Sequence, residues 1–456
     1  MRRLGFWLAL AASAAILYGA HVLDSDEGLS LNAAWQLWHG KRLYVDFIEY
    51  VPPGTPWAIL AAWKLAGTPS YLAAKLLALG AWLGSAVAVH GAARRIAGSI
   101  HAADLAVLFW LGCGTSYSLV NHNSLSSCAA TGALAAALAA LERGERRYPF
   151  LAGLAGGLTL LFLHTKGALL LVACGVSLAV FARGDARARL GGFLGGAALP
   201  LLSLPLCASP STLLDALAVF PARTGYLAHS SFSPAILAAE AAIVLVLALW
   251  AALRRSAPLA LLALVQAALY ASALNLVDLE HAGINSFPLA IAVAAGLAAV
   301  VEPLALRGWT PARLAGAIAA GLVVFLFTPP GRAAFADSVW AIDVLGHEQP
   351  GLLESPEIRR AEHIYAGPFL PGFYYELRKP NPFRVSNMLL CDPACQREVL
   401  ETLQATRPEY AFLHYPMAQR FGYVPGDVDR WLLEHYARCP NEQFPGLLIL
   451  ARDRCP

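Results

Sequence analysis

The sequence predicts a polytopic α-helical membrane protein with a small α/β domain at its C-terminal end. Hydrophobic residues make up 58% of the 456 residues and charged residues only 14%, whereas a soluble domain carries about 25% charged residues. Apolar segments recur along residues 1–328, and the composition becomes polar after Pro329. We therefore expect a transmembrane domain over residues 1–328 and a separate domain over residues 329–456.

About eleven apolar segments approach the roughly 20 residues that a membrane-spanning helix needs. The predicted spans are residues 4–23, 71–93, 102–120, 123–141, 149–165, 167–183, 190–207, 235–253, 257–274, 285–302 and 312–328. The apolar run 57–66 is shorter and is expected to dip into the membrane interface. The first span lacks a small-residue cleavage site before the acidic segment that follows it, so we interpret it as an uncleaved helix and not as a signal peptide.

The positions of the arginines predict the orientation, because cytoplasmic loops carry an excess of Lys and Arg. With the N-terminus in the cytoplasm, arginines fall in every cytoplasmic turn, for example Arg94, Arg95, Arg143, Arg254 and Arg255. The opposite loops carry far fewer basic residues. Together with an odd number of spans, this asymmetry predicts an inner-membrane protein whose C-terminal domain is periplasmic.

The segment 24–56, between the first two spans, is the long polar interruption near the start of the chain. Its acidic residues are Asp24, Asp26, Glu27 and Asp46, with Glu49 just behind them. Acidic residues in the first turn of a helix favour the helix dipole and the free N–H groups there. From the residues alone, a structural and a catalytic role of Asp26 and Glu27 both stay open.

A helix is expected to follow this acidic pair. Asp24 or Ser25 can cap its N-terminus, and Gly40 lies just past its end. The apolar side chains at helical spacing are Leu31, Ala34, Trp35 and Trp38. Two tryptophans on the apolar face of a helix beside a membrane span predict that the helix lies flat in the interface.

Three basic residues near the outer ends of spans are candidates for binding an anion. Lys166 lies in the tight turn His164-Thr165-Lys166-Gly167, His281 follows Asp278, and Lys75 lies near the outer end of the second full span. Each has a plain alternative, because lysines near helix ends extend to the headgroups and loop histidines are often merely solvated. For the polar turn at 121–124, a structural role as a hairpin between two spans explains the residues at least as well as a functional role does.

Residues 24–56 carry the pattern D-E-G, then A-x-x-L-x-x-G-x-x-L-Y-x-D-F, then P-P-G-x-P. This pattern resembles the first extracytoplasmic loop of GT-C superfamily glycosyltransferases, and most of all the bacterial group of protein mannosyltransferases and aminoarabinose transferases. The stretch GLAGGLTLLFLHTKG at 153–167 resembles another segment of these proteins. Elsewhere the resemblance is one of topology.

The resemblance implies an inverting glycosyltransferase that uses a sugar on a polyprenyl phosphate and a lipid, glycan or protein acceptor. It implies that Asp26 is the catalytic carboxylate, with Glu27 and Asp46 holding the acceptor or Asp26 itself, and that Lys166 neutralises the donor phosphate together with His281 or Lys75. Lys75 is included because a charge within a span usually marks a pathway or a site. A divalent cation on Asp26 and Asp46 stays open, since hard cations prefer carboxylates. Membrane lipids are expected partners, and nucleic acid is not.

Two other classes of protein compete with this interpretation. A transporter or lipid flippase also needs many helices and intramembrane charges, but such proteins often show internal repeats, and the sequence shows none. A scaffold that has lost catalysis is disfavoured by the intact Asp26-Glu27 pair and by Asp46. The chain has no Gly-rich nucleotide loop, in agreement with a lipid-linked donor.

The segment 329–456 predicts strands at 362–366, 410–414 and 447–451, and a helix at 394–405 with Asp392 as cap and Pro393 in its first position. Its four cysteines are Cys391, Cys395, Cys439 and Cys455. They could bind zinc, but in an oxidising compartment two disulfides are favoured. Local spacing favours Cys391 with Cys395 and Cys439 with Cys455. The cysteines of the membrane segments, Cys113, Cys128, Cys174 and Cys207, are expected to be inert.

Overall fold

A computed structural model describes residues 2–19, 25–114, 118–182, 185–223, 232–306, 310–336, 338, 355–420, 422–441 and 446–456. The chain forms two compact units, and neither is contiguous in the sequence. The helical unit comprises Met1–Ala20, Lys75–Leu204 and Ser231–Ser338. The mixed unit comprises His21–Ala74, Pro205–Ser230 and Val339–Pro456.

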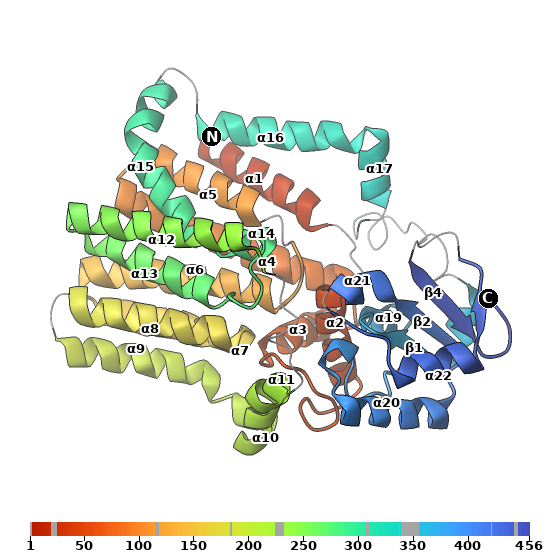
Figure 1. The fold of residues 1–456 in the computed structure, drawn as a ribbon. Coiled ribbons are helices and arrows are strands. Elements are labelled where there is room, and N and C mark those ends of the chain that lie inside the picture. Colours follow the sequence, from red (N-terminus) through yellow and green to blue (C-terminus); the bar gives the residue numbers. More distant parts are fainter. Residues whose placement is uncertain are drawn as a thin grey trace. The chain divides into compact units, whose positions relative to one another are not determined.

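The helical unit is a bundle in which a helix occupies each of the predicted spans (Figure 1). These helices are α1 (Arg2–Tyr18), α4 (Tyr71–Ala97), α5 (Ile100–Gly114), α6 (His122–Arg143), α7 (Arg147–Phe162), α8 (His164–Phe181), α9 (Ala186–Leu201), α12 (Pro234–Arg254), α13 (Ala257–Ala271), α15 (Phe287–Leu306) and α16 (Pro311–Leu326). Two short helices, α14 (Leu279–Ile284) and α17 (Pro329–Ala336), complete the unit. The last residues of the first predicted span lie outside the described residues.

The predicted number of membrane spans is not confirmed. Within the described residues, six helices are long and apolar enough to cross a membrane, and the bent pair α16 and α17 would make a seventh. Helices α1, α5 and α13 are apolar but shorter. Helix α6 is among the six and begins at a polar cap, since the Asn121 side chain accepts a hydrogen bond from the Ser124 N–H. Multi-pass membrane character itself is supported by these apolar helices.

Close approach of the helices depends on small residues, as is common in membrane bundles. Where α7 crosses α9, a Cβ atom at Gly153, Gly157 or Gly196 would overlap the backbone of the facing helix. Elsewhere in the unit large aromatic rings fill the core. Trp82 of α4 stacks on Trp110 of α5 with ring centroids 5.6 Å apart.

The mixed unit contains the acidic outer segment and the C-terminal domain. Its first part consists of α2 (Ser25–Trp38), α3 (Gly54–Ala66) and the first turn of α4. The segment after α9 adds α10 (Pro210–Leu214), a π-helical turn (Asp215–Val219) and α11 (Phe220–Arg223). Ala33 of α2, Leu43, Tyr44, Phe47 and Ala216 of that turn form one hydrophobic cluster, so segments far apart in the sequence share a core.

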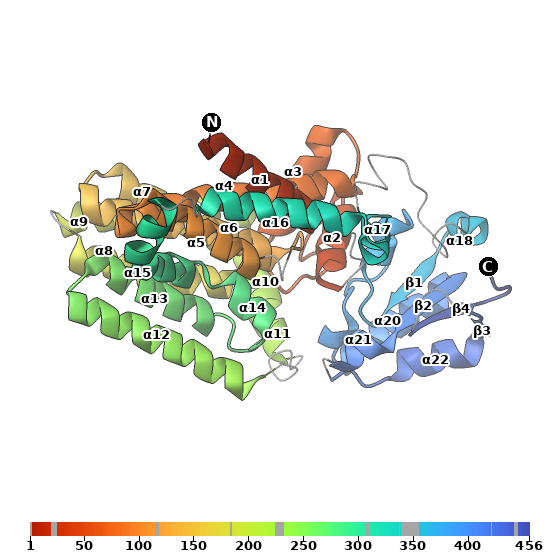
Figure 2. The same ribbon diagram turned by 90° about the horizontal axis from the view of Figure 1, so that it is seen from above.

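The C-terminal domain is built on a four-stranded sheet in the order β1-β2-β4-β3. The strands are β1 (Ile364–Gly367), β2 (Tyr410–His414), β3 (Ala437–Cys439) and β4 (Leu447–Ala451). The first two pair in parallel with Ile364 opposite Tyr410, and the other pairs are antiparallel. Its helices are α18 (Pro356–Arg360), α19 (Gly372–Glu376), α20 (Pro393–Thr406), α21 (Tyr415–Arg420) and α22 (Asp427–His435), and α20 and α22 lie side by side (Figure 2).

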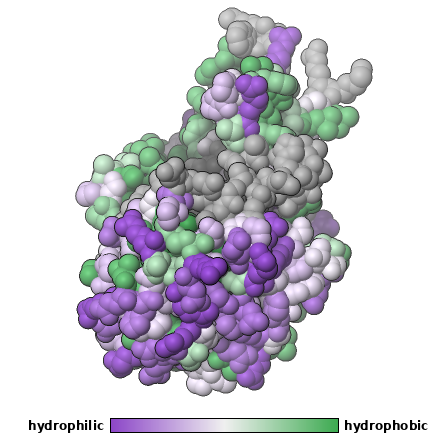
Figure 3. Space-filling view, turned by 90° about the vertical axis from the view of Figure 1, so that its right-hand side faces the viewer, coloured by the Kyte–Doolittle hydropathy of each residue, from purple (hydrophilic) through white to green (hydrophobic). Residues whose placement is uncertain are grey.

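The predicted elements of this domain are largely confirmed. Strands β2 and β4 have the predicted bounds, and β1 begins two residues later than expected. Strand β3 was not predicted, because it has three residues, two of them exposed, and therefore lacks an apolar pattern. The surface in Figure 3 is mainly hydrophilic over the C-terminal domain, whereas many leucines and valines of the helical unit, such as Leu245 and Leu253, are exposed.

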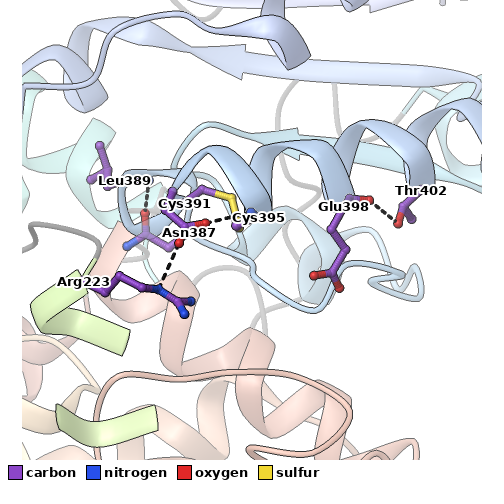
Figure 4. Close-up of a disulfide and its surroundings, with 8 residues drawn as sticks. Arg223, Asn387, Leu389, Cys391, Cys395, Glu398 and Thr402 are labelled. Atoms are coloured by element: carbon purple, nitrogen blue, oxygen red, sulfur yellow. Dashed lines mark hydrogen bonds and ion pairs between the residues drawn. A yellow bond between two sulfur atoms is a disulfide. The ribbon is translucent and has the colours of Figure 1, made fainter. Parts of the chain in front are cut away.

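Both favoured disulfides are present, between Cys391 and Cys395 and between Cys439 and Cys455. The first closes the turn that starts α20 (Figure 4). Asp392 caps this helix by accepting a hydrogen bond of 2.8 Å from the Cys395 N–H, with Pro393 in the first helical position. The other Asp392 oxygen lies 3.0 Å from Nε of Arg223 at the end of α11.

Helix α2 does not have the surroundings that its sequence predicted. The whole stretch 29–36 is buried, including the polar Asn32 and Gln36. The Trp35 indole N–H donates to the Lys379 carbonyl of the C-terminal domain at 2.8 Å. The apolar face was predicted correctly, but it is covered by protein, because apolar periodicity does not distinguish a lipid neighbour from a protein neighbour. The predicted cap Asp24 lies outside the described residues.

Candidate functional site

Asp26 and Glu27 lie in the first turn of α2. Their side chains differ in solvent exposure. The Asp26 side chain is half-buried, and its carbonyl accepts a hydrogen bond from the Ser30 hydroxyl. Glu27 is fully buried, at 0% exposure. The Tyr71 hydroxyl, at the start of α4, donates to the Glu27 carboxylate at 2.6 Å. Glu27 is therefore held inside the protein, whereas Asp26 keeps part of its side chain exposed.

This arrangement predicts different outcomes for two changes. Tyr71→Phe removes a donor from a buried carboxylate and should lower the free energy of unfolding on the order of 1–3 kcal/mol. Glu27→Gln keeps an oxygen that can accept from Tyr71 and should be milder in both stability and turnover. Thermal unfolding and initial rates of the two purified variants check this. Loss of all turnover in a stably folded Glu27→Gln protein would show that the ionised carboxylate itself takes part in the reaction.

Asp46 is engaged by Arg42 within one tight turn. Its carboxylate accepts from the Arg42 backbone N–H at 2.7 Å and from the guanidinium at 3.1 and 3.2 Å. The hydrogen bonds from the side chain and backbone of Arg42 hold the pKa of Asp46 below its ordinary value. Asp46 is therefore an ionised group that shapes the loop 42–46.

Glu49 is a buried carboxyl of the same segment that the sequence noted without assigning a role. It is 3% exposed, and its Oε1 atom has no hydrogen-bond partner within the described part of the chain. Burial raises the pKa of Glu49 well above its ordinary value. Burial thus favours the neutral form of this carboxyl.

In the helical unit, the three basic candidates contact one short segment, 118–127, which comprises the residues just before α6 and the first turns of that helix. Lys75 Nζ of α4 lies 3.4 Å from the Ser118 carbonyl. Lys166 Nζ of α8 lies 3.4 Å from the Asn123 carbonyl and 2.7 Å from the Ser127 hydroxyl. His281 Nε2 of α14 lies 3.4 Å from Nδ2 of Asn123. We call Lys75, Lys166 and His281 the cation cluster.

Lys166 is a buried member of the cation cluster. It is 1% exposed, and the hydrogen-bond partners of its ammonium group among the described residues are neutral oxygens of Asn123 and Ser127. Among the residues that the structure describes, no carboxylate forms an ion pair with it. An ammonium group in such surroundings lacks the counter-charge that normally offsets its desolvation.

A polar network behind Lys166 holds its partner in place. The Ser127 hydroxyl lies 3.3 Å from Oδ1 of Asn285, and Gln266 donates to the Asn285 carbonyl at 3.0 Å. The Gln266 side chain also accepts from the Leu289 N–H at 3.0 Å. Ser127 and Gln266 were not among the predicted site residues, because a single Ser or Gln in an apolar run forms no motif. The signal that could have found them is a polar residue inside a predicted span.

His281 is oriented by Asp278, the cap of α14. Its Nδ1 lies 2.9 and 3.0 Å from the two Asp278 oxygens, and its backbone N–H donates to Oδ1 at 2.8 Å. Burial raises the pKa of Asp278, but the hydrogen bonds from His281 outweigh it, so the net shift is downward. An ionised Asp278 then fixes the ring with Nε2 toward Asn123.

The described residues contain no group of three or more His, Cys, Asp or Glu side chains arranged to hold a metal ion. Asp26, Glu27 and Asp46 belong to the mixed unit, and the cation cluster belongs to the helical unit. The first group contains a carboxylate of intermediate exposure, and the second contains side chains that can carry positive charge and are largely buried.

Comparison with solved structures gives the fold. A scan against protein-family models and a search of the curated proteins give no match. ArnT from Cupriavidus metallidurans bound to undecaprenyl phosphate matches with a TM-score of 0.60 at 15% identity, over 98% of this chain and 97% of that chain. Its apo state matches with a TM-score of 0.58 at 16% identity, again over 98% and 97%.

An oligosaccharyltransferase of Archaeoglobus fulgidus matches with a TM-score of 0.44 at 12% identity, over 98% of this chain and 74% of that chain. The two ArnT matches show that this chain shares the fold of that protein along nearly its whole length, in agreement with the resemblance that the acidic outer segment suggested.

Proposed function

We propose that the protein is a membrane glycosyltransferase that moves a sugar from a polyprenyl-phosphate donor to a lipid, glycan or protein acceptor. The observation that carries the proposal is the buried Lys166 ammonium group without a carboxylate partner among the described residues. Ionisable residues inside membrane segments are costly and commonly mark a functional site. An anionic headgroup beside Lys166 would supply the missing counter-charge.

A phosphate is the anion that agrees best with the other members of the cation cluster. Lys75 and His281 contact the same segment 118–127 as Lys166, so three groups that can carry positive charge lie around one chain segment. A phosphate that leaves in a group transfer gains negative charge, and preorganised cations stabilise it most in apolar surroundings. The ArnT match, whose own ligand is undecaprenyl phosphate, supports a lipid-linked phosphate.

The proposed reaction uses Asp26 as general base. An acceptor hydroxyl oxygen attacks the anomeric carbon, its proton passes to the Asp26 carboxylate, and the bond between that carbon and the phosphate oxygen breaks. The polyprenyl phosphate leaves with the electron pair of that bond, and the configuration inverts. Glu27 and Asp46 support the acidic segment through Tyr71 and Arg42.

The experiment is transfer of a radiolabelled sugar from polyprenyl-phosphate donors in membranes that contain the protein, with binding of the unglycosylated polyprenyl phosphate measured in parallel. We expect both binding and transfer. Binding and movement of the lipid across the membrane without transfer to any acceptor would instead identify a lipid transporter. If the protein does not bind polyprenyl phosphate, the proposed class of donor is wrong.

The proposed location is the inner membrane, with the N-terminus in the cytoplasm and residues 329–456 in the periplasm. The arginine asymmetry of the loops carries this proposal. Reporter fusions after Arg147 and after Thr328 check it: a cytoplasm-active reporter should work at Arg147 and fail at Thr328. Activity of that reporter at Thr328 would reverse the orientation of the C-terminal domain.

A further inference from the structure

One side of helix α2 packs against the segment 372–386 of the C-terminal domain. Gly28, Asn32 and Trp35 lie on this side at the i, i+4 and i+7 spacing of a helix face. At its N-terminal end, a Cβ atom added to Gly28 would lie 2.9 Å from the backbone of Gly372. A Cβ atom added to Gly372 would lie 2.8 Å from Cα of Gly28. The two backbones therefore touch at a point where neither residue can carry a side chain without a shift.

Further contacts fix the register of this packing. Asn32 donates to the Ser386 hydroxyl at 2.9 Å, and Asn381 donates to the same hydroxyl at 2.9 Å and to Asn32 Oδ1 at 3.3 Å. One helical turn further on, the Trp35 indole donates to the Lys379 carbonyl. These contacts are buried and involve hydrogen bonds from several segments, so α2 cannot slide or rotate against the C-terminal domain without breaking them.

The glycine contact lies directly beside the proposed catalytic residue. Asp26 and Glu27 immediately precede Gly28, and all three are in the first turn of α2. On the other side of this turn, Glu27 is held by Tyr71. Contacts with Tyr71 and with Gly372 thus hold the turn in place on two sides. A displacement of Gly28 is transmitted to Asp26 through two peptide units that are nearly rigid.

We propose that Gly372 is a positioning residue for the transfer reaction: its missing side chain lets the C-terminal domain seat the first turn of α2, and this sets the position of the Asp26 carboxylate. The inference rests on the proposed function, because it assigns Gly372 an effect on the step in which Asp26 acts. The C-terminal domain is then part of the catalytic apparatus and does more than recruit an acceptor.

The test compares two glycine variants with a matched control. In Gly372→Ala and Gly28→Ala the new methyl group pushes the same two backbones apart, so both should lower kcat about 10- to 100-fold, as expected for a base misplaced by about 1 Å. The KM for the donor and the Kd for polyprenyl phosphate should stay within about twofold. In the control, Gly426→Ala, the methyl group meets only the flexible Gln396 side chain of the same domain, and kcat should be unchanged.

A second experiment tests Gly372→Ala in protein that also carries Asp26→Asn and so lacks the proposed base. In Asp26→Asn protein, Gly372→Ala should cause no further loss of the residual transfer, because the residue through which it acts is already absent. Hydrogen exchange of the peptide that contains the first turn of α2 should be faster in Gly372→Ala than in the wild type.

The outcomes separate the inference from the proposed function. A wild-type protein without transfer would overturn the proposed function and with it the role of Gly372. If the wild type transfers sugar and Gly372→Ala does so at the same rate, only the inference is overturned. It is also overturned if Gly372→Ala lowers transfer equally with Asp and with Asn at position 26, or if Gly426→Ala has an equal effect, since both results indicate a general effect on folding.

Discussion

Asp26→Asn is expected to lower sugar transfer by about two to four orders of magnitude while the protein stays folded. Asparagine keeps the size of the side chain and most of its hydrogen bonding, but it cannot take the proton of an acceptor hydroxyl. A purely structural role at the start of α2 would contribute only about 1 kcal/mol of stability, through capping or the helix dipole. The two roles therefore predict opposite patterns of rate and stability.

Initial rates with a polyprenyl-phosphate donor, together with the unfolding temperature of the purified variant, distinguish these patterns. Asp46→Asn is the matched control, because Asp46 belongs to the same segment but its carboxylate is bound by Arg42. We expect its loss of rate to be much smaller than that of Asp26→Asn. Normal transfer by Asp26→Asn with a lowered unfolding temperature would make Asp26 a helix-start residue and remove the base from the proposed mechanism.

Lys166→Met should lower transfer by about two orders of magnitude, which corresponds to roughly 3 kcal/mol of lost charge stabilisation at the leaving phosphate. Methionine keeps much of the apolar stem and removes the ammonium group. Stability should not fall, because Lys166 is 1% exposed and pairs with no carboxylate among the described residues, so the substitution also removes a buried charge that lacks compensation. The affinity for polyprenyl phosphate should fall together with the rate.

Lys64→Met is the control for this prediction. Lys64 is exposed, and its ammonium group lies over the Trp38 ring at 4.1 Å from the centroid, so it tests the loss of a basic residue outside the cation cluster. Binding of polyprenyl phosphate and the rate of transfer are measured for both variants. Wild-type behaviour of Lys166→Met would contradict a role of this ammonium group in binding or catalysis.

The parts of the structure that depend on local pattern could be predicted from the sequence. The apolar runs located the membrane-type helices, Asp392 and Pro393 located the start of α20, and the spacing of the cysteines located both disulfides. Asp26, Glu27 and Asp46 were predicted as site residues through the resemblance of their segment to a known loop, and Lys166 through a second stretch. These assignments stay predictions.

What the sequence could not show depends on contacts between distant segments. The hydrogen bond from Tyr71 to Glu27 and the meeting of Gly28 with Gly372 join residues with no common pattern. Ser127 and Gln266 look like isolated polar residues in apolar runs until the fold brings them together around Lys166 and Asn285. Helix α2 was placed at the membrane surface because a buried apolar face has the same periodicity whatever covers it.

The contacts made by segment 118–127 determine which of its residues can change in related chains. Lys75 contacts the carbonyl of Ser118, and Lys166 contacts the carbonyl of Asn123. Every amino acid carries a carbonyl, so these two contacts place no demand on side-chain identity at positions 118 and 123. Chains that share this fold can keep both lysines in place while the residue at position 118 varies, whereas the side chains of Asn123 and Ser127 also contact His281 and Lys166 and are less free to change.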